Sequence, residues 1–153
     1  MVEQLRDLYH GEKRLEELLP LMIQNSCDSE LRLILNDYHQ MNEEQIMRIR
    51  QAFEFLYVPK RGETCDAMIA MAREAEALIV RCGNEEVRDA ALLTVLQHII
   101  HYQIAGYGAV CTYAQMLDFD HIAALIHLNL EEEKIVDQRL IRLAERSINL
   151  QAI

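Results

Sequence analysis

The fold is decided by the first stretch of the chain, residues 2–25, which read VEQLRDLYHGEKRLEELLPLMIQN. Apolar residues recur in this stretch at spacings of three and four, which predicts an amphipathic helix with one buried face. That face carries leucines on either side of a single acid: Leu5, Leu8, Glu12, Leu15 and Leu19. An acid in the middle of a buried stripe indicates a polar site inside a helical core.

The same helical spacing runs through most of the chain, and the strict alternation that marks strands is missing, so the protein is expected to be all-α. Pro59 and Gly62 stop the second helix, and Thr64 is a candidate N-cap for the next one. After the first helix, four more are predicted, over residues 29–57, 64–82, 85–117 and 120–146. Of the five predicted helices, all are long except the one at 64–82.

The lengths of the connections predict the topology. Short turns join the first long helix to the second and the third to the fourth, whereas about 27 residues separate the two pairs and can cross the molecule lengthwise. This connectivity predicts a ferritin-like antiparallel four-helix bundle with a short additional crossover helix between the second and third long helices. A generic up-down bundle with an extra helix is the alternative. A chain of 153 residues is expected to form one such domain over residues 1–153.

Composition excludes several classes of protein. A hydrophobic content of 51% with only five Gly and two Pro excludes a disordered chain. The net charge of -10, with Lys and Arg scattered, does not favour a nucleic-acid partner. The N-terminus has no basic region followed by an apolar stretch, and no apolar run reaches the ~18 residues of a membrane span, so we expect a cytoplasmic protein without membrane contact. No CxxC pair is present, which predicts reduced, mostly buried thiols at Cys27, Cys65, Cys82 and Cys111.

A second acid interrupts an apolar stripe in the last long helix, which we place at Leu125, Leu128, Glu132, Ile135 and Arg139. A buried carboxylate without compensation costs several kcal/mol or takes up a proton, so Glu12 and Glu132 each need a cation, a hydrogen-bond donor or a water. A metal site is one interpretation. Hydrogen bonds across the core are another, and a stripe that is off by one residue, leaving the acids in water, is a third.

The other two long helices supply no further acids at the expected level. Their inward positions are Tyr38, Met41, Asn42 and Gln45 on one, and Leu96, Ile100, Gln103 and Tyr107 on the other. Amides, a thioether and phenols are poor ligands for two divalent cations, which favour carboxylate oxygen and imidazole. Three pairs at helical spacing contain histidine but are expected to face away from the axis as solvated or interfacial features: His39 with Glu43, His98 with His101, and His127 with Glu131.

Small residues are concentrated at 104–109, where Gly106 and Gly108 stand in mid-helix. Glycine is unfavourable there relative to alanine, so something must approach that backbone closely. Packing by another helix of the same chain is the preferred explanation, and a second protomer is the alternative.

Several short motifs, in order along nearly the whole chain, resemble the ferritin-like family of uncharacterised bacterial proteins typified by the stress-associated YciE and YciF. They are residues 5–9 (LRDLY) with Glu12 and Leu19-Pro20, Gln45 with Arg48, residues 65–68 (CDAM), Gln97 with residues 101–108 (HYQIAGYG), and residues 130–132 (LEE) with Asp137.

The resemblance implies a ferritin-like bundle with a crossover helix, a dimer, and a two-metal centre whose physiological role is not established. Carried over by position, Glu12 and Glu132 match acids of that centre. Where the family has acids before and after its His-Tyr pair, this chain has Ile100 and Gln103. The family's His-x-x-Glu-Thr stretch on the second helix is replaced around residues 38–42, so Tyr38 and Gln103 are substituted positions of the ligand layer.

Two functions are therefore expected to compete. The first is a structural or partner-binding homodimer in a bacterial stress response, with a degenerate di-metal site, no cofactor and an unknown protein partner. The alternative is a working iron or manganese carboxylate site for metal binding or redox chemistry. An enzyme without metal is not favoured, because the chain has neither a nucleophile elbow nor a Gly-rich phosphate loop.

Overall fold

The protein is described by a computed structural model over residues 1–62 and 64–148, which contain five α-helices and no strand. The helices are α1 (Val2–Asn25), α2 (Ser29–Phe55), α3 (Asp66–Arg81), α4 (Glu85–Met116) and α5 (Asp120–Leu143), and α5 continues into a π-helical turn, η1 (Ala144–Ile148). The prediction of an all-α chain is confirmed. Every helix begins within two residues of its predicted start.

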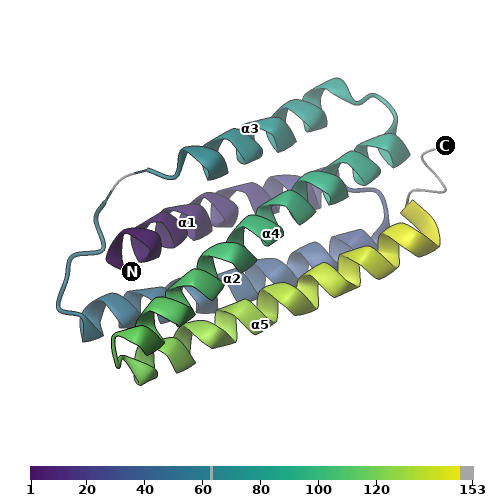
Figure 1. Ribbon diagram of the computed structural model, residues 1–153. Helices are drawn as coiled ribbons and strands as arrows, with labels where there is room; N and C mark the ends of the chain where they lie inside the picture. The colour runs from purple at the N-terminus through teal and green to yellow at the C-terminus, as the bar shows by residue number, and fades with distance from the viewer. Residues whose placement is uncertain (63, 149–153) are drawn as a thin grey trace.

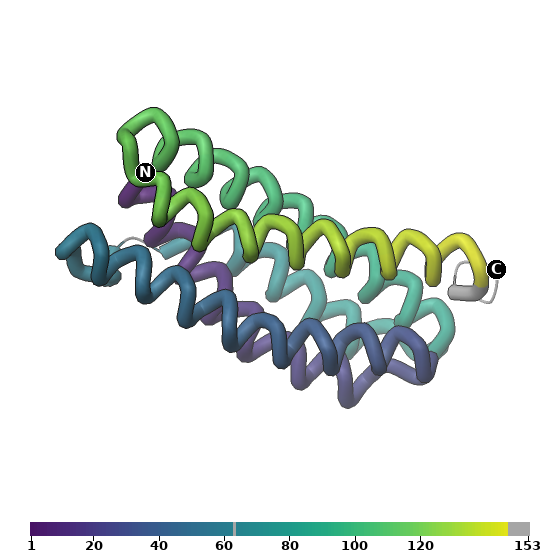
Figure 2. The backbone as a smooth tube through the Cα atoms, turned by 90° about the horizontal axis from the view of Figure 1, so that it is seen from below, coloured from purple at the N-terminus to yellow at the C-terminus, as the bar shows by residue number. Residues whose placement is uncertain are grey.

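The four long helices lie alongside one another (Figure 1). α1 packs against α2 and α4, and α5 packs against α2 and α4, so each long helix has two long neighbours. Seen from below, α2 and α5 run side by side over most of their length (Figure 2). α3 packs on the outside of α1 and α4 and returns the chain from the end of α2 to the opposite end of the molecule, where α4 begins (Figure 1).

Polar side chains at the helix starts explain where the helices begin. Asp28 caps α2 and Asn84 caps α4, each accepting a hydrogen bond from a backbone N–H three residues further on. The prediction that Thr64 caps α3 is wrong, because the residue before that helix is Cys65, which makes no side-chain cap. The short turn between α1 and α2 is fixed from outside by Asp89 of α4, whose buried carboxylate accepts two backbone N–H groups of that turn.

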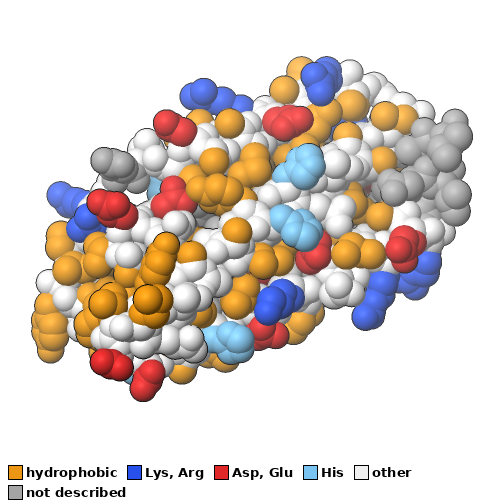
Figure 3. Space-filling model, viewed as in Figure 1, with side chains coloured by type: hydrophobic (Ala, Val, Ile, Leu, Met, Phe, Trp, Pro, Cys, Tyr) orange, Lys and Arg blue, Asp and Glu red, His pale blue; other side chains and the backbone are white. Residues whose placement is uncertain are grey.

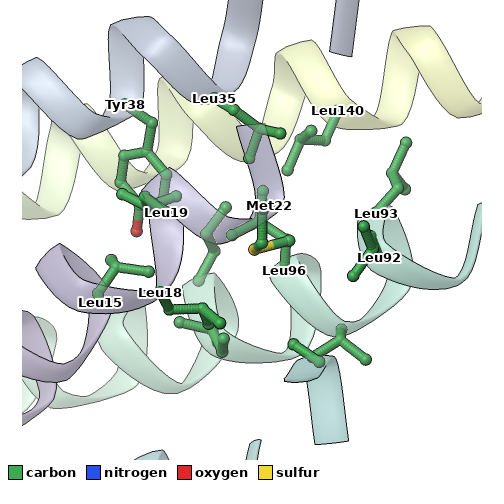
Figure 4. Close-up of a cluster of buried hydrophobic side chains, with 14 of the residues drawn as sticks. Leu15, Leu18, Leu19, Met22, Leu35, Tyr38, Leu92, Leu93, Leu96 and Leu140 are labelled. Atoms are coloured by element: carbon green, nitrogen blue, oxygen red, sulfur yellow. The ribbon is translucent and has the colours of Figure 1, made fainter. Parts of the chain in front are cut away.

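The hydrophobic core is divided into two clusters. Figure 4 shows part of the larger cluster, in which side chains of α1, α2, α4 and α5 meet, among them Leu18, Met22, Leu35, Leu96 and Leu140. The smaller cluster lies toward the other end of the long helices and includes Leu5, Leu8, Ile49, Phe53, Tyr107, Val110 and Ile126. Five buried polar residues of the long helices lie in sequence between these clusters, so the core has a polar layer near its middle: Glu12, Asn42, Gln45, Gln103 and Glu133.

Gly106 explains the small residues of α4. A methyl group added at its Cα would lie 2.8 Å from Cδ2 of the buried Leu8, so α4 approaches α1 closely at this point. A methyl group at Gly108 would meet nothing within 4 Å. The prediction that packing by another helix of the same chain requires the small residue is thus confirmed for Gly106 and wrong for Gly108.

Two expectations from composition can be compared with the structure. All four cysteines are free thiols, but only Cys65 and Cys111 are buried, while Cys82 is half-buried and Cys27 is exposed. Among the described residues, no helix has both the length and the apolar character that crossing a membrane requires.

Candidate functional site: the central polar layer

The buried polar residues between the two hydrophobic clusters come from all four long helices. We call the following set the central polar layer; each member has 0% of its surface exposed: Glu12 from α1, Tyr38, Asn42 and Gln45 from α2, Gln103 and Tyr107 from α4, and Asn129 and Glu133 from α5. The sequence had placed six of these eight residues on inward faces. Asn129 and Glu133 are the two that it missed.

Glu12 is held by three neutral donors. Nδ2 of Asn42 lies 2.5 Å from one carboxylate oxygen, and Nε2 of Gln103 lies 2.8 Å from the other. The hydroxyl of Tyr107 donates to the same oxygen as Gln103. The expected inward placement of Glu12 and Gln103 is confirmed, and two other helices hold the carboxylate in position.

Glu133 is held in the same way by α2. The hydroxyl of Tyr38 donates to one of its carboxylate oxygens at 2.7 Å, and Nε2 of Gln45 donates to the other at 2.9 Å. Tyr38 therefore lies in the layer as predicted, but as a hydrogen-bond donor to an acid that the sequence interpretation had not selected.

The expectation that Glu132 points into the core is wrong. Its side chain is at the edge of the core, 22% exposed, and forms an ion pair of 2.7 Å with Arg48 of α2. The neighbouring Glu133 occupies the inward position. The error arose because Leu128 and Ile135 look like part of a buried stripe, yet they are 50% and 56% exposed, so α5 is apolar on two faces.

A signal for the correct face was present in the sequence. Ile122, Ile126, Val136 and Leu140 lie on one face of α5 together with Asn129 and Glu133, and all are buried. Extending the stripe to both ends of the helix, beyond the few residues around its centre, would have selected Glu133.

Arg48 closes the layer between α2 and α5. Its Nη1 donates to Oδ1 of the buried Asn129 at 2.9 Å as well as to Glu132, and its Nη2 donates to Glu44 at 3.1 Å. Nδ2 of Asn129 donates in turn to the backbone carbonyl of Gln45 at 3.2 Å. Arg48 is thus used at the edge of the layer, and within the described residues no hydrogen bond or ion pair joins it to Glu12 or Glu133.

Burial controls the acidity of the layer. Loss of hydration raises the pKa of Glu12 from its ordinary 4.5 to about 7, against the opposing effect of the hydrogen bonds from Tyr107 and Asn42. The pKa of Glu133 is also raised, first by burial and then by repulsion from Glu12. Burial likewise raises the pKa of the phenols of Tyr38 and Tyr107, so both remain hydrogen-bond donors.

Three buried oxygens in the layer have no hydrogen-bond partner among the described residues. They are Oδ1 of Asn42, Oε1 of Gln45 and Oε1 of Gln103. Each belongs to an amide whose nitrogen donates to Glu12 or Glu133. A buried acceptor without a donor is unfavourable, so a proton on a carboxyl group, a buried water or a cation is needed beside these amides.

The layer does not fit a two-metal centre. Two divalent cations would carry four positive charges, whereas Glu12 and Glu133 together supply at most two negative charges. The layer also contains no imidazole, which is a common ligand of such ions. The amide and phenol groups also turn N–H and O–H donors toward the carboxylates, where metal ions would have to bind. In the part of the chain that the structure describes, no group of three or more His, Cys, Asp or Glu side chains is gathered so that it could hold a metal ion.

The histidine pairs lie outside the layer, as expected. His98, His101 and His127 are exposed. Nε2 of His127 is 3.8 Å from Glu131 on the surface of α5, and Nε2 of His101 is 3.3 Å from Asp137 beside α4.

Known proteins share both the sequence and this arrangement of helices. Protein YciF of Escherichia coli (strain K12) is 34% identical over 149 residues, which cover 97% of this chain and 90% of YciF. The crystal structure of this stress protein matches with a TM-score of 0.92 at 33% identity, over 97% of this chain and 94% of that chain. YcfI of Rhodopseudomonas palustris, a suggested structural protein, matches with a TM-score of 0.87 at 31% identity, over 90% of this chain and 88% of that one. The family described as a domain of unknown function, DUF892, matches residues 1–153, and the chain belongs to this family.

Proposed function

We propose that this chain is a ferritin-like four-helix bundle that acts as a structural or partner-binding homodimer in a bacterial stress response, with a degenerate di-metal site at its centre. The relatives support the setting, since YciF is a stress protein and YcfI a suggested structural protein. The proposal places the protein in the cytoplasm and assigns it no catalytic activity, no cofactor, and no nucleic-acid or membrane partner.

The observation that carries the proposal is the way in which the two buried acids are satisfied. Among the described residues, the five donors to Glu12 and Glu133 are all neutral amides or phenols, and they come from α2 and α4. Each of the two carboxyl groups therefore ties its own helix to a neighbouring one. Such a network gives the helices a fixed register, which two purely apolar clusters would specify less strictly.

The charge of the layer can be lowered without a metal ion. Because burial raises the pKa of both Glu12 and Glu133, a proton on one of them lowers the charge of the layer and supplies an O–H donor. The unpartnered amide oxygens of Asn42, Gln45 and Gln103 are acceptors for such a donor or for buried water.

A second candidate function is a single iron or manganese ion bound at Glu12 and Glu133. The observation that favours it is the same set of three unpartnered amide oxygens, because carbonyl and carboxylate oxygens are ligands of hard cations. In this arrangement the amides would turn their oxygens toward the ion.

The two candidates differ in how metal affects stability. We would measure the midpoint of thermal unfolding at pH 8 in chelator and then with added Mn²⁺ or Fe²⁺, for the parent and for Glu133→Gln. A structural layer predicts the same midpoint in both solutions, because only a ligand that binds the folded state raises it.

Glu132→Gln provides the matched control, because it makes the same substitution at the preceding residue, whose side chain lies outside the layer. A rise of several degrees with metal in the parent and in Glu132→Gln, but not in Glu133→Gln, would replace the structural proposal by the metal site.

A further inference from the structure

A groove beside the first half of α1 gathers cations on an acidic protein. It lies where the segment 59–62, which follows α2, passes α1, and its volume is about 380 Å³. We call it the basic groove, and the side chains that line it are Arg6, Tyr9, His10, Lys13, Lys60 and Arg61. Four of these six are cations, and none of the described residues that line the groove is an acid, although the net charge of the chain is -10. In Figure 3, basic side chains stand at the left edge of the molecule, where this segment passes the start of α1 in Figure 1, with acidic side chains beside them.

Arg6 is fixed in the groove by the backbone of the segment. It lies on one face of α1 with His10 and Lys13, since these residues are spaced by four and three. Its Nε and Nη2 donate to the carbonyl oxygen of Pro59 at 3.3 and 3.1 Å. A guanidinium group has five N–H donors, so the donors that are not directed at Pro59 remain for a ligand. The guanidinium is therefore held in one place before any ligand binds.

His10 is fixed by the backbone that follows the segment. Its Nδ1 accepts a hydrogen bond from the backbone N–H of Cys65 at 3.1 Å. A ring nitrogen that accepts a hydrogen bond carries no proton, so the neutral imidazole of His10 carries its proton on Nε2. This N–H has no hydrogen-bond partner within the described residues, and it belongs to a side chain that lines the groove. His10 thus adds a neutral donor to the four cations.

Gly62 lets the segment lie directly on α1. A methyl group added at its Cα would be 2.3 Å from Cδ of Arg6 and 2.9 Å from Cβ of the same residue. Since Cβ cannot move unless the helix moves, any larger residue would push the segment away from α1. The glycine therefore keeps the preceding Lys60 and Arg61 beside the cations of the helix.

Tyr9 brings two cations together at the groove. Nζ of Lys60 lies 5.6 Å from the centroid of its ring, and Cζ of Arg50 of α2 lies 5.9 Å from it. Burial by itself would raise the pKa of Tyr9, but the hydrogen bond and charge of Arg50 and the charge of Lys60 lower it below its ordinary 10.0. The region around the ring is thus electrically positive.

We propose that the basic groove binds a small phosphorylated molecule with at least two negative charges. Arg6 and Lys13 approach the groove from α1, whereas Lys60 and Arg61 approach it from the segment. A phosphate group accepts hydrogen bonds on several sides, whereas a carboxylate accepts them only near one plane, so donors from two directions suit a phosphate better. A volume of about 380 Å³ is within the range of small-molecule sites. The inference concerns a surface that neither the central polar layer nor the proposed function uses.

A larger pocket next to the groove does not fit such a ligand. This pocket, of about 500 Å³, shares Arg6 and Gly62 with the groove but is also lined by Glu3 and Asp7. Two carboxylates repel a phosphate group, so charge directs the ligand to the basic groove.

Lys13 is the one lysine or arginine of the groove that forms an ion pair with a carboxylate within the described residues. Its Nζ donates to Glu16, one turn further along α1. The two side chains are 39% and 33% exposed, and a pair of this kind contributes little to stability. A phosphate group can therefore take the place of Glu16 at little cost.

The first experiment is isothermal titration calorimetry with inorganic pyrophosphate as the probe, in low salt. The parent is compared with a double variant, Lys60→Gln with Arg61→Gln, whose side chains are exposed, so that the variant should fold. We expect the double variant to bind at least about tenfold more weakly, because two charged donors are lost. The matched control is Arg73→Gln with Arg81→Gln, which removes the same charge from exposed positions of α3 outside the groove.

The control should bind pyrophosphate within about twofold of the parent. Equal weakening of the two double variants would mean that only the net charge matters and would overturn the site. A parent whose Kd for pyrophosphate exceeds about 1 mM would overturn it as well.

The second experiment locates the ligand without reference to affinity. In the ¹H–¹⁵N spectrum of the imidazole groups, the signals of His10 are those that disappear in His10→Gln. Pyrophosphate should shift these signals, and it should leave those of His127, which is exposed on α5, in place. If the parent binds pyrophosphate but the signals of His10 do not move, the ligand is not in the basic groove.

The third experiment tests the chemical class of the ligand. Citrate, at the same ionic strength, is expected to bind at least about tenfold more weakly than pyrophosphate, and equal binding would overturn the preference for phosphate. Vesicles that contain phosphatidic acid offer the same phosphate group on a lipid. The protein should stay in the supernatant when such vesicles are sedimented, and co-sedimentation would overturn a free small molecule as the ligand.

Discussion

At the scale of single residues, Glu12 shows why this core is unusual. Its carboxyl group has no exposed surface and accepts hydrogen bonds from the neutral Asn42, Gln103 and Tyr107, whereas Arg48 donates at the edge of the layer. Its protonation therefore becomes part of the stability of the fold.

Protonation of Glu12 predicts how stability depends on pH in metal-free protein. The pKa of Glu12 is about 7 in the folded protein, against an ordinary 4.5, so the folded state binds its proton more tightly than the unfolded chain does. The contribution of this group to the free energy of unfolding is full below about pH 4.5 and is lost as the pH rises through about 7. Glu133 acts in the same direction because its pKa is also raised.

The measurement is urea unfolding in chelator at several pH values between about 4.5 and 8, for the parent and for Glu12→Gln. The parent should lose stability across this range, and the variant, which has one buried titrating group fewer, should lose less. If the free energy of unfolding fell equally with pH in the two proteins, Glu12 would already be ionised at about pH 4.5.

Arg48 gives a second prediction at this scale. Arg48→Ala removes the donor to the buried Asn129 and to Glu132, and we expect a loss of about 1–3 kcal/mol in the free energy of unfolding. Glu44→Ala removes only the exposed partner of the same guanidinium and should cost less than about 1 kcal/mol. Chemical denaturation of the two variants beside the parent tests the difference, and equal losses would mean that the inner contacts add nothing.

At the scale of elements, α4 offers a matched pair of glycines. Gly108→Ala should stabilise the protein by about 0.5–1 kcal/mol, because alanine is favoured in a helix interior and nothing lies within 4 Å of the new methyl group. Gly106→Ala gains the same preference but brings a methyl group to 2.8 Å from Leu8, and overpacking of this kind costs about 1–3 kcal/mol.

Melting curves of both variants test this contact between α1 and α4. Gly106→Ala should be the less stable of the two by at least about 1 kcal/mol, which is a difference of several degrees for a chain of this size. If the two alanine variants were equally stable, the close approach of the helices at Gly106 would not matter for folding.

The elements also show what the sequence could and could not predict. α1 has one apolar face, so its stripe led directly to the buried Glu12, and the inward amide and phenol positions of α2 and α4 were also predicted correctly. α5 has a second apolar face at Leu128 and Ile135, and a short window on that helix selected Glu132 in place of Glu133. On α5, the spacing within a short window therefore selected the wrong one of two apolar faces.

The hydrogen bonds of the layer could not be predicted from the sequence for a different reason. Asn42 and Gln103 donate to Glu12 only because the register of α1, α2 and α4 brings both amide nitrogens within 3 Å of its carboxylate. That register is a property of the packed helices, and spacing along one helix carries no information about it. The inward position of an amide such as Gln103 could be predicted, but the acid to which it donates a hydrogen bond could not.

The whole molecule consists of two hydrophobic clusters joined by a polar layer, and we propose that this layer needs no metal ion. The most direct test is elemental analysis of the untagged protein after growth with ample iron, manganese and zinc, beside melting curves with and without chelator. We expect less than about a tenth of a metal ion per chain and the same melting temperature in both solutions. One or two metal ions per chain, lost on chelation together with stability, would contradict it.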